Sequence, residues 1–375
     1  MPITIGVAKE TVPGERRVAL VPEVAAKFIA LGAHIVIERG AGITAQFPDA
    51  AYNGVEFVDN AAAVLARADV FLSVQPPSPE TVTALKSGAV VAGYLAPHAR
   101  HDLVRALRDS GKTSFAVELI PRISRAQSMD ALSSQAAVAG YKAVLIAANT
   151  LDKFLPMLTT AAGTIRPAQV LVIGVGVAGL QAIATAKRLG AVVEAYDVRS
   201  ATREQVKSLG AKFVETGISA DGAGGYAREL TAEEKAKQQE VLDGRIAAAD
   251  AVICTAGVPG RQAPRIVSRA AVERMKAGAV IVDILAENGG NCELSRAGET
   301  VEHGGVRIIG PVNLSSSLAY HASEMYSRNL LNFLTPAIAK GGELAIDFAD
   351  EVFAGSVVTH AGSIKHEPTA TAVGN

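Results

Sequence analysis

The chain alternates short apolar runs with longer amphipathic stretches over nearly all of its 375 residues. This rhythm is typical of repeated strand–helix–strand units, which form a parallel sheet covered by helices. It predicts helices at 22–31 and 101–110, with Gly32 as a C-cap, and a connecting helix at about 133–152. It predicts one series of strands at 3–8, 34–38, 70–74, 89–94 and 113–118, and a second at 170–173, 192–196, 213–214, 251–255, 279–283 and 306–309.

The two series of strands predict an α/β protein with two Rossmann-like, doubly wound parallel-sheet domains separated by a cleft. We expect the first domain to comprise residues 1–135 with 320–375, and the second to comprise 136–319. A cleft between two such domains is a common place for a cofactor. The polar segment 366–375 is expected to fray.

Composition and charge narrow the possible functions. Apolar residues make up 49% and charged residues 19%, as in a folded chain with a large core. The net charge of −1 offers no basic excess for phosphates, so nucleic acid is not expected as a partner. Cys254 and Cys292 form no C-x-x-C pair and the histidines lack metal-ligand spacing, so we expect a reducing compartment and no metal. Without a signal peptide or an apolar run of ~18 residues, the chain is expected to be soluble and to have no direct membrane span.

The strongest motif follows the strand at 170–173. Gly174, Gly176 and Gly179 form G-x-G-x-x-G before a helical stretch, and the next strand ends in Asp197. In dinucleotide sites the first glycine allows a tight turn, the second lets the backbone approach a pyrophosphate, and the third lets the helix pack closely. The helix N-terminus attracts phosphate, and a carboxylate placed like Asp197 accepts hydrogen bonds from ribose hydroxyls. The motif therefore predicts dinucleotide binding, the alternative being a glycine turn that only packs a helix on a sheet.

Asp197 also bears on the choice of cofactor. A carboxylate there repels a 2′-phosphate, which favours NAD over NADP. Arg199 and Arg203 lie close in sequence, and an arginine can accept such a phosphate. We interpret both arginines as solvated charges at the start and on the face of a helix.

A polar segment, residues 121–135, follows the strand at 113–118 and carries arginines, amides, serines and one aspartate. Loops after parallel strands often carry binding residues. From the residues alone, Asp130 or Ser128 could be only the N-cap of the helix that follows. Residues 287–291 are a weaker candidate for lining a site, because turn chemistry alone explains their Asn and Gly.

Together these segments resemble the NAD(H)-binding component of proton-translocating nicotinamide nucleotide transhydrogenases. The resemblance implies that the first domain is of the alanine dehydrogenase/transhydrogenase type and that the second binds NAD(H). It also implies direct hydride transfer from NADH to NADP⁺ on a partner subunit, coupled to proton translocation in a membrane partner. The similarity lies in residues 9–10, 13–19, 121–134, 139–141, 174–190, 223–227 and 329–334, and runs to about residue 365.

The resemblance also implies roles for individual residues. Hydride passes from ring carbon to ring carbon, so the protein supplies position and exclusion of water, not an acid or base. Tyr226 would lie on a mobile loop that closes over the nucleotide, before a helix opened by the capping box Thr231-x-x-Glu234. Residues that fix the nicotinamide would be Arg122, Gln127, Asp130 and Ser133, with Gln127 facing the partner. Cofactor-binding residues would be Gln127, Ser128, Met129, Asp130, Gly174, Gly176, Val177, Gly179, Asp197, Val198, Arg199, Gly225, Tyr226 and Gly257.

Partners and alternatives complete the expectation. The resemblance implies a homodimer on the cytoplasmic side of the inner (plasma) membrane, attached through separate NADP-binding and membrane subunits. One alternative is an alanine dehydrogenase, which needs a lysine aligned with residues 74–77 and a histidine aligned with 93–96. This chain has Gln75 and no histidine at those positions, although His98 is close. A second alternative, an NAD-binding regulatory module without hydride transfer, leaves the dense polar segment at 122–130 unexplained.

Overall fold

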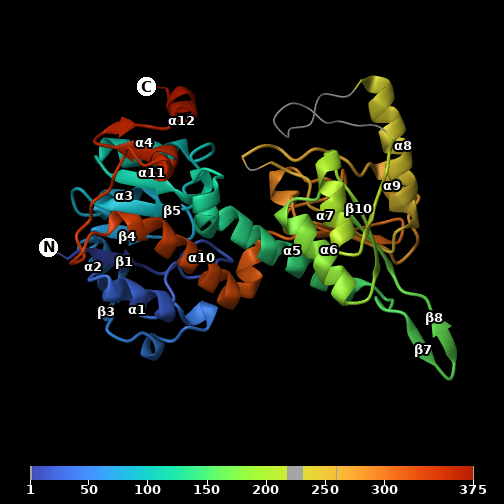
Figure 1. The fold of residues 1–375 in the computed structure, drawn as a ribbon, viewed down its shortest axis with the longest axis horizontal. Coiled ribbons are helices and arrows are strands. Elements are labelled where there is room, and N and C mark those ends of the chain that lie inside the picture. The colour runs from blue at the N-terminus through green and yellow to red at the C-terminus, as the bar shows by residue number, and fades with distance from the viewer. Residues whose placement is uncertain (1, 218–230, 259, 375) are drawn as a thin grey trace. The chain divides into compact units, whose positions relative to one another are not determined.

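The computed structural model describes residues 2–217, 231–258 and 260–374. It divides into two compact units, unit 1 (Met1–Gln135 with Ser316–Asn375) and unit 2 (Ala136–Ser315) (Figure 1). Each unit has a largely parallel sheet with helices on both faces, which confirms the predicted fold class.

Unit 1 is built on an eight-stranded sheet. Its strands are β1 (Thr4–Val7), β2 (His34–Glu38), β3 (Glu56–Val58), β4 (Val70–Leu72), β5 (Val90–Gly93), β6 (Thr113–Ala116), β16 (Val357–His360) and β17 (Ser363–Ile364). Its helices are α1 (Pro22–Ala30), α2 (Ala61–Leu65), α3 (Pro79–Ala84), α4 (His101–Asp109), α10 (Ala319–Leu334), α11 (Glu351–Ser356) and α12 (Glu367–Val373), with the 3-10 segment η4 (Ser124–Met129). The six strands β3-β2-β1-β4-β5-β6 lie side by side in this order and are parallel. The sequence order of the strands runs one way from β1 to β3 and the other way from β4 to β6. Such sheets bind ligands at the point of reversal, here between β1 and β4.

The core of unit 1 follows from the period-two alternation of its strands. In β2, Ile35 and Ile37 pack with α1 and α10, while Val36 between them packs with α2 and α4 on the other face. Both faces of the sheet are therefore buried, as continuous apolar strands require.

Unit 2 has a seven-stranded sheet in the order β11-β10-β9-β12-β13-β15-β14, which reverses direction between β9 and β12. Its strands are β9 (Gln169–Ile173), β10 (Val192–Tyr196), β11 (Lys212–Phe213), β12 (Ala251–Cys254), β13 (Val280–Asp283), β14 (Thr300–His303) and β15 (Val306–Ile309), with a separate hairpin of β7 (Leu158–Thr160) and β8 (Gly163–Ile165). Its helices are α5 (Ala131–Thr150, which begins in unit 1), α6 (Val177–Arg188), α7 (Arg203–Ser208), α8 (Ala232–Ala248) and α9 (Arg269–Glu273). Helices α5, α6 and α7 pack on one face of the sheet, and α8 and α9 on the other.

Helix α5 is the predicted connecting helix. It has the length and mean hydropathy that a membrane-crossing helix needs, which the search for an uninterrupted apolar run missed. Its apolar side chains Ala143, Val144 and Ala147 are buried in the core of unit 2. A Cβ at Gly140 would overlap the carbonyl oxygen of Ala178, so α5 packs tightly against α6. These contacts are those of a core helix.

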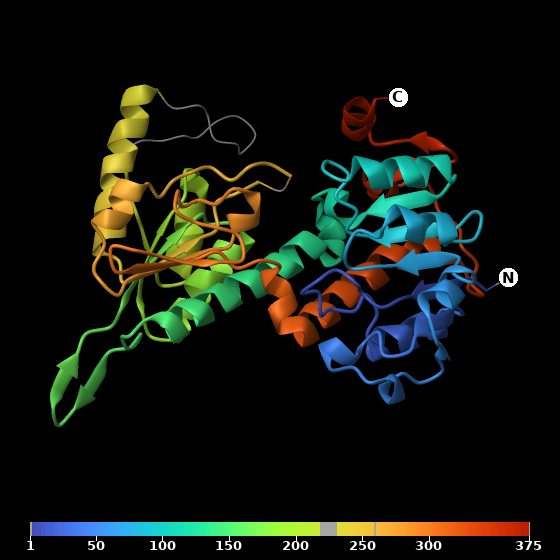
Figure 2. The same cartoon turned by 180° about the vertical axis from the view of Figure 1, so that it is seen from behind.

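Three features differ from the sequence-based expectation. The short strands β3 and β14 were not predicted, and neither was the β7–β8 hairpin, which projects from unit 2 in both views (Figures 1 and 2). The segment expected to fray forms α12, because Ala370 and Val373 pack against the core beside α4. Strands β3, β14, β7 and β8 have only three or four residues each, which offers little periodicity to recognise from sequence.

Candidate functional site

The glycine motif forms the turn between β9 and α6. Gly174 has φ +91°, a left-handed conformation that favours glycine, and its N–H donates to the Tyr196 carbonyl at 2.8 Å. A Cβ at Gly179 would overlap the Gly174 carbonyl oxygen, so α6 lies directly against the turn. The hydroxyl of Thr255, at the end of β12, donates to that same oxygen at 2.8 Å. The turn therefore lies where the strand order of unit 2 reverses.

Gly176 differs from the other two glycines. It is the N-cap of α6 with φ −82°, and a Cβ at this position would meet no heavy atom within 4 Å. The first residue of the helix, Val177, is exposed. Open space thus lies next to a helix N-terminus, where free N–H groups and the helix dipole favour phosphate.

Asp197 lies at the end of β10 with its carboxylate nearly buried. One oxygen accepts the Val175 N–H at 2.7 Å, and the other accepts the Arg199 N–H at 2.8 Å. The Arg199 guanidinium binds both oxygens, at 3.0 Å each. Asp197 therefore joins the glycine turn to the loop after β10.

A cavity of about 200 Å³ opens beside Asp197. Val198, residues 213–217 at the end of β11 and Gln238 of α8 contribute to its lining. Arg203 also lines it, placing its guanidinium 5.8 Å from the Phe213 ring centroid. The side chains of Arg199 and Arg203 are 43% and 40% exposed, in keeping with solvated charges, and each also forms an ion pair, Arg199 with Asp197 and Arg203 with Glu215.

The polar segment of unit 1 forms η4 and the start of α5. Asp130 precedes α5 and accepts the Ser133 N–H at 2.8 Å, as an N-cap does, and the Ser133 hydroxyl at 2.6 Å. Arg122, Gln127 and Ser128 are exposed. The side chain of Met129 is buried in the core of unit 1, so a ligand could reach only its main chain.

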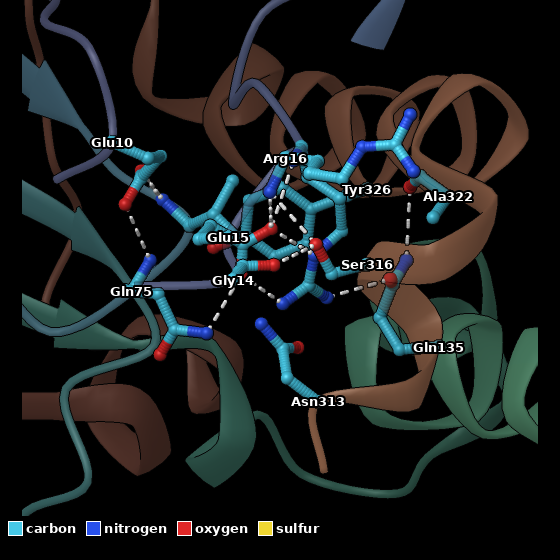
Figure 3. Close-up of polar contacts among 12 residues, drawn as sticks. Glu10, Gly14, Glu15, Arg16, Gln75, Gln135, Asn313, Ser316, Ala322 and Tyr326 are labelled. Carbon is cyan, nitrogen blue, oxygen red and sulfur yellow. Dashed lines mark hydrogen bonds and ion pairs between the residues drawn. The ribbon is translucent and has the colours of Figure 1, made fainter. Parts of the chain in front are cut away.

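A network of charged and amide groups fills the end of the unit 1 sheet between β1 and β4 (Figure 3). The Arg17 guanidinium binds Glu15 through Nε at 2.8 Å and Nη2 at 2.6 Å, and it donates through Nη1 to Gln135 at 2.8 Å. Gln75, in the loop after β4, also donates to Glu15, at 2.7 Å. Glu15, Arg17 and Gln135 are buried, so these bonds compensate the cost of removing their charges and dipoles from water.

Glu10 lies in the same network. Its two carboxylate oxygens accept the main-chain N–H groups of Val74 at 2.5 Å and Gln75 at 3.2 Å. Burial of the carboxyl raises its pKa to about 7, because the two N–H bonds offset only part of the desolvation. A carboxyl group that titrates near neutral pH thus holds the loop after β4.

Other predicted residues have structural partners. Asn291, fully buried, donates to the Ala256 carbonyl at 2.7 Å and accepts the Ala256 N–H at 3.0 Å, so it supports the loop after β12 that carries Gly257. The capping box of Thr231 and Glu234 is confirmed. Gly225 and Tyr226 lie outside the described residues.

Histidines and cysteines offer no metal site in the described part of the chain, where no group of three or more His, Cys, Asp or Glu could hold an ion. His98 is exposed in the turn before α4. His101, the first residue of α4, is partly buried, and its Nε2 has no hydrogen-bond partner among the described residues. Burial raises the pKa of both Cys254 and Cys292, which disfavours their thiolate forms.

Comparison with known families identifies both halves of the chain. Residues 6–139 match the family described as "Alanine dehydrogenase/PNT, N-terminal domain", and residues 143–367 match "Alanine dehydrogenase/PNT, C-terminal domain". The chain belongs to the alanine dehydrogenase/PNT family.

Within the alanine dehydrogenase/PNT family, relatives of two kinds are similar to this chain. An NAD(P) transhydrogenase alpha-subunit chain of Rhodospirillum rubrum is 46% identical, over 99% of both chains. The crystal structure of a transhydrogenase from Sinorhizobium meliloti superposes with a TM-score of 0.85 at 42% identity, covering 97% of this chain and 99% of that one. Alanine dehydrogenase of Bacillus subtilis is 31% identical over 80% of this chain and 73% of its own length.

Sequence reasoning missed several residues that shape these sites in this alanine dehydrogenase/PNT member. Residues 213–217 and Gln238 carry no motif, although the place of residues 213–217 at the C-terminal end of β11 was a usable signal. Thr255 was seen only as the end of a strand. Glu10 lies in one of the segments that carry the family resemblance, but its contacts with the loop after β4 depend on tertiary structure.

Proposed function

We propose that this protein is the NAD(H)-binding subunit of a proton-translocating transhydrogenase, which transfers a hydride directly between NADH and NADP⁺ held by a partner subunit. One observation carries the proposal. The glycine turn, whose Val175 N–H is bound by Asp197 at the end of the next strand, lies in a chain that is 46% identical over 99% of its length to an NAD(P) transhydrogenase alpha-subunit chain. We further propose that unit 2 is the nucleotide domain.

In unit 2, the space beside Gly176 and Val177 would receive the pyrophosphate, and Gly257 would approach it from the loop after β12. Asp197, Val198 and Arg199 would contact the adenosine ribose. Asp197 already accepts four N–H groups, two of them from the Arg199 guanidinium. A carboxylate offers about four lone-pair positions, so ribose hydroxyls must displace the guanidinium. The 200 Å³ cavity beside Asp197 supports placement of the adenine there.

In unit 1, Asp130 and Ser133 would bind the nicotinamide carboxamide. The Ser133 hydroxyl donates its one proton to Asp130, so towards a ligand both groups act as acceptors. They therefore suit the NH₂ of a carboxamide, while Arg122 can donate to its oxygen. Ser128 and Met129 would contact the ring through the main chain, and Gln127 would face the partner.

The bound dihydronicotinamide supplies the hydride, so this chain needs no acid or base at the reacting atoms. Its residues contribute orientation, which can account for a large part of the rate of a two-ring transfer. We also propose that the protein acts as a homodimer at the cytoplasmic face of the inner membrane. NADP-binding and membrane subunits would attach it there, and the proton pathway would lie in those subunits.

The alternative is an alanine dehydrogenase, supported by the 31% identity with the Bacillus subtilis enzyme. Such an enzyme needs a group that takes a proton from the amine. At the positions that the resemblance assigns to its lysine and histidine, this chain has Gln75, bound to Glu15, and no histidine among residues 93–96, with His98 exposed beyond them. These substitutions favour the transhydrogenase.

The test is to mix the protein with a soluble NADP-binding transhydrogenase component and to follow hydride transfer from NADH to an oxidised NADP analogue. We expect Asp130→Asn to slow transfer at least about tenfold while NADH still binds, because asparagine remains an N-cap but presents an N–H where the carboxamide needs an acceptor. Gln127→Asn should act similarly by shortening the side chain that faces the partner.

The control is Arg125→Ala on the same η4 segment. The guanidinium of Arg125 is bound to Asp350, so its removal should not affect transfer. Wild-type rates in Asp130→Asn and Gln127→Asn would contradict the role of this segment. Oxidation of L-alanine by the pure protein would favour the dehydrogenase, and NADH binding without transfer to any partner would favour a regulatory module.

A further inference from the structure

Two asparagines of α10 hold the main chain of η4. Asn329 donates through Nδ2 to the Ser128 carbonyl oxygen at 2.9 Å, and Asn332 donates to the same oxygen at 3.0 Å. Residues three apart on a helix share one face, so both amides can reach a single acceptor. A carbonyl oxygen has two lone pairs, and the two donors therefore saturate it.

Asn329 also holds the first turn of α5. Its Oδ1 accepts the Ser134 hydroxyl at 2.7 Å, so both ends of its amide are used, and the residue is only 8% exposed. Ser128 and Ser134 flank the stretch that contains Asp130 and Ser133. One buried side chain thus fixes both ends of the segment proposed to bind the nicotinamide.

A third contact from α10 reaches the next residue of α5. Gln135 donates to the Ala322 carbonyl at 3.0 Å, and the close-up shows these two residues joined (Figure 3). Gln135 in turn accepts from Arg17. Helix α10 therefore acts as a support along the whole transition from η4 into α5.

We propose that Asn329 and Asn332 are positioning residues for hydride transfer, which set the main chain of η4 and the start of α5 in the geometry that the nicotinamide requires. The inference rests on the function proposed above. Hydride transfer is sensitive to displacements of about 1 Å, which can cost on the order of 100-fold in rate. Binding through the pyrophosphate and adenosine, by contrast, would depend on unit 2. Loss of the asparagines should therefore reduce the rate and leave NADH affinity nearly unchanged.

The main variant is Asn332→Leu, which keeps a branched side chain of similar size and removes the N–H donor. Asn332 is half-buried, so the fold should survive. Asn329→Asp keeps an acceptor for Ser134 but places a carboxylate against the Ser128 carbonyl, and should have a larger effect. The matched control is Ser327→Ala, which removes a different buried contact of α10, the 3.1 Å bond from the Val21 N–H to the Ser327 hydroxyl.

Two measurements decide the proposal. With saturating NADH and a soluble NADP-binding component, Asn332→Leu should transfer hydride at least about tenfold more slowly, with its NADH Kd within about twofold of wild type, while Ser327→Ala keeps the wild-type rate per folded molecule. In the nucleotide-free protein, amide hydrogens of residues 123–133 should exchange at least about tenfold faster in Asn332→Leu and unchanged in Ser327→Ala.

The outcomes separate this inference from the function on which it rests. Unchanged amide exchange in Asn332→Leu, or a wild-type transfer rate in both asparagine variants, overturns the positioning role. The proposed function still stands in that case, provided that the wild-type protein transfers hydride. Failure of the wild-type protein to transfer hydride overturns the proposed function and with it the role in transfer. The exchange result then still shows whether the asparagines hold the segment.

Discussion

Gly176→Ala should weaken NADH binding without unfolding the protein. The methyl group would enter space that no heavy atom of the chain occupies within 4 Å, and φ −82° suits alanine. Stability should change by less than about 1 kcal/mol, because the gain from a less flexible unfolded chain is offset by a weaker N-cap. The same methyl would displace the pyrophosphate from the N-terminus of α6. An overpacking cost of about 1–3 kcal/mol would raise the Kd for NADH about 5- to 150-fold.

Two other glycines make the experiment internally controlled. A Cβ at Gly179 would overlap a main-chain oxygen of the turn, so Gly179→Ala should lose more than about 2 kcal/mol of stability together with binding. Gly244, exposed on α8, has open space around it, and Gly244→Ala should gain up to about 1 kcal/mol and bind normally.

The assay pairs a fluorescence titration with NADH and a urea denaturation curve for each variant. Gly176→Ala is informative only if its denaturation curve matches that of wild type within the expected range. Wild-type affinity in that folded variant would refute the assignment of the pyrophosphate to this turn. Wild-type stability in Gly179→Ala would refute the close packing of α6 on the turn.

Two further predictions concern pH and have opposite signs. Glu10 has a folded pKa raised from 4.5 to about 7, so its contribution to stability is present below pH 4.5 and is lost as pH rises through 7. The shift corresponds to about 3 kcal/mol, and denaturation free energies at pH 5 and pH 8 should differ less in Glu10→Gln than in wild type. Burial tends to raise the pKa of Asp250, but the Gln169 N–H and the ammonium groups of Lys153 and Lys276 outweigh it and lower that pKa. Its contribution is therefore present above pH 3.8 and lost below it, so Asp250→Asn should cost about 2 kcal/mol at pH 7 and less at pH 3; equal costs at both pH values would contradict this account.

The sequence alone determined the features that depend on neighbouring residues. Strand periodicity and the helices between strands predict two doubly wound sheets, and the structure confirms them. The glycine turn could be recognised because Gly174, Gly176 and Gly179 act within one strand–turn–helix unit. Asp197 follows at the end of the very next strand, which pairs with β9. Parallel neighbours place their C-terminal ends together, so spacing along the chain is enough to predict this contact.

Tertiary structure decided the contacts between residues distant in sequence. Asn329 and Ser128 are separated by 201 positions, and no periodicity pairs them. The pKa of Glu10 depends on how far the loop after β4 buries its carboxyl. Local pattern follows from the propensities of adjacent residues, whereas burial and the pairing of buried polar groups are set by which elements pack together. Those packing relations are fixed only in the folded chain.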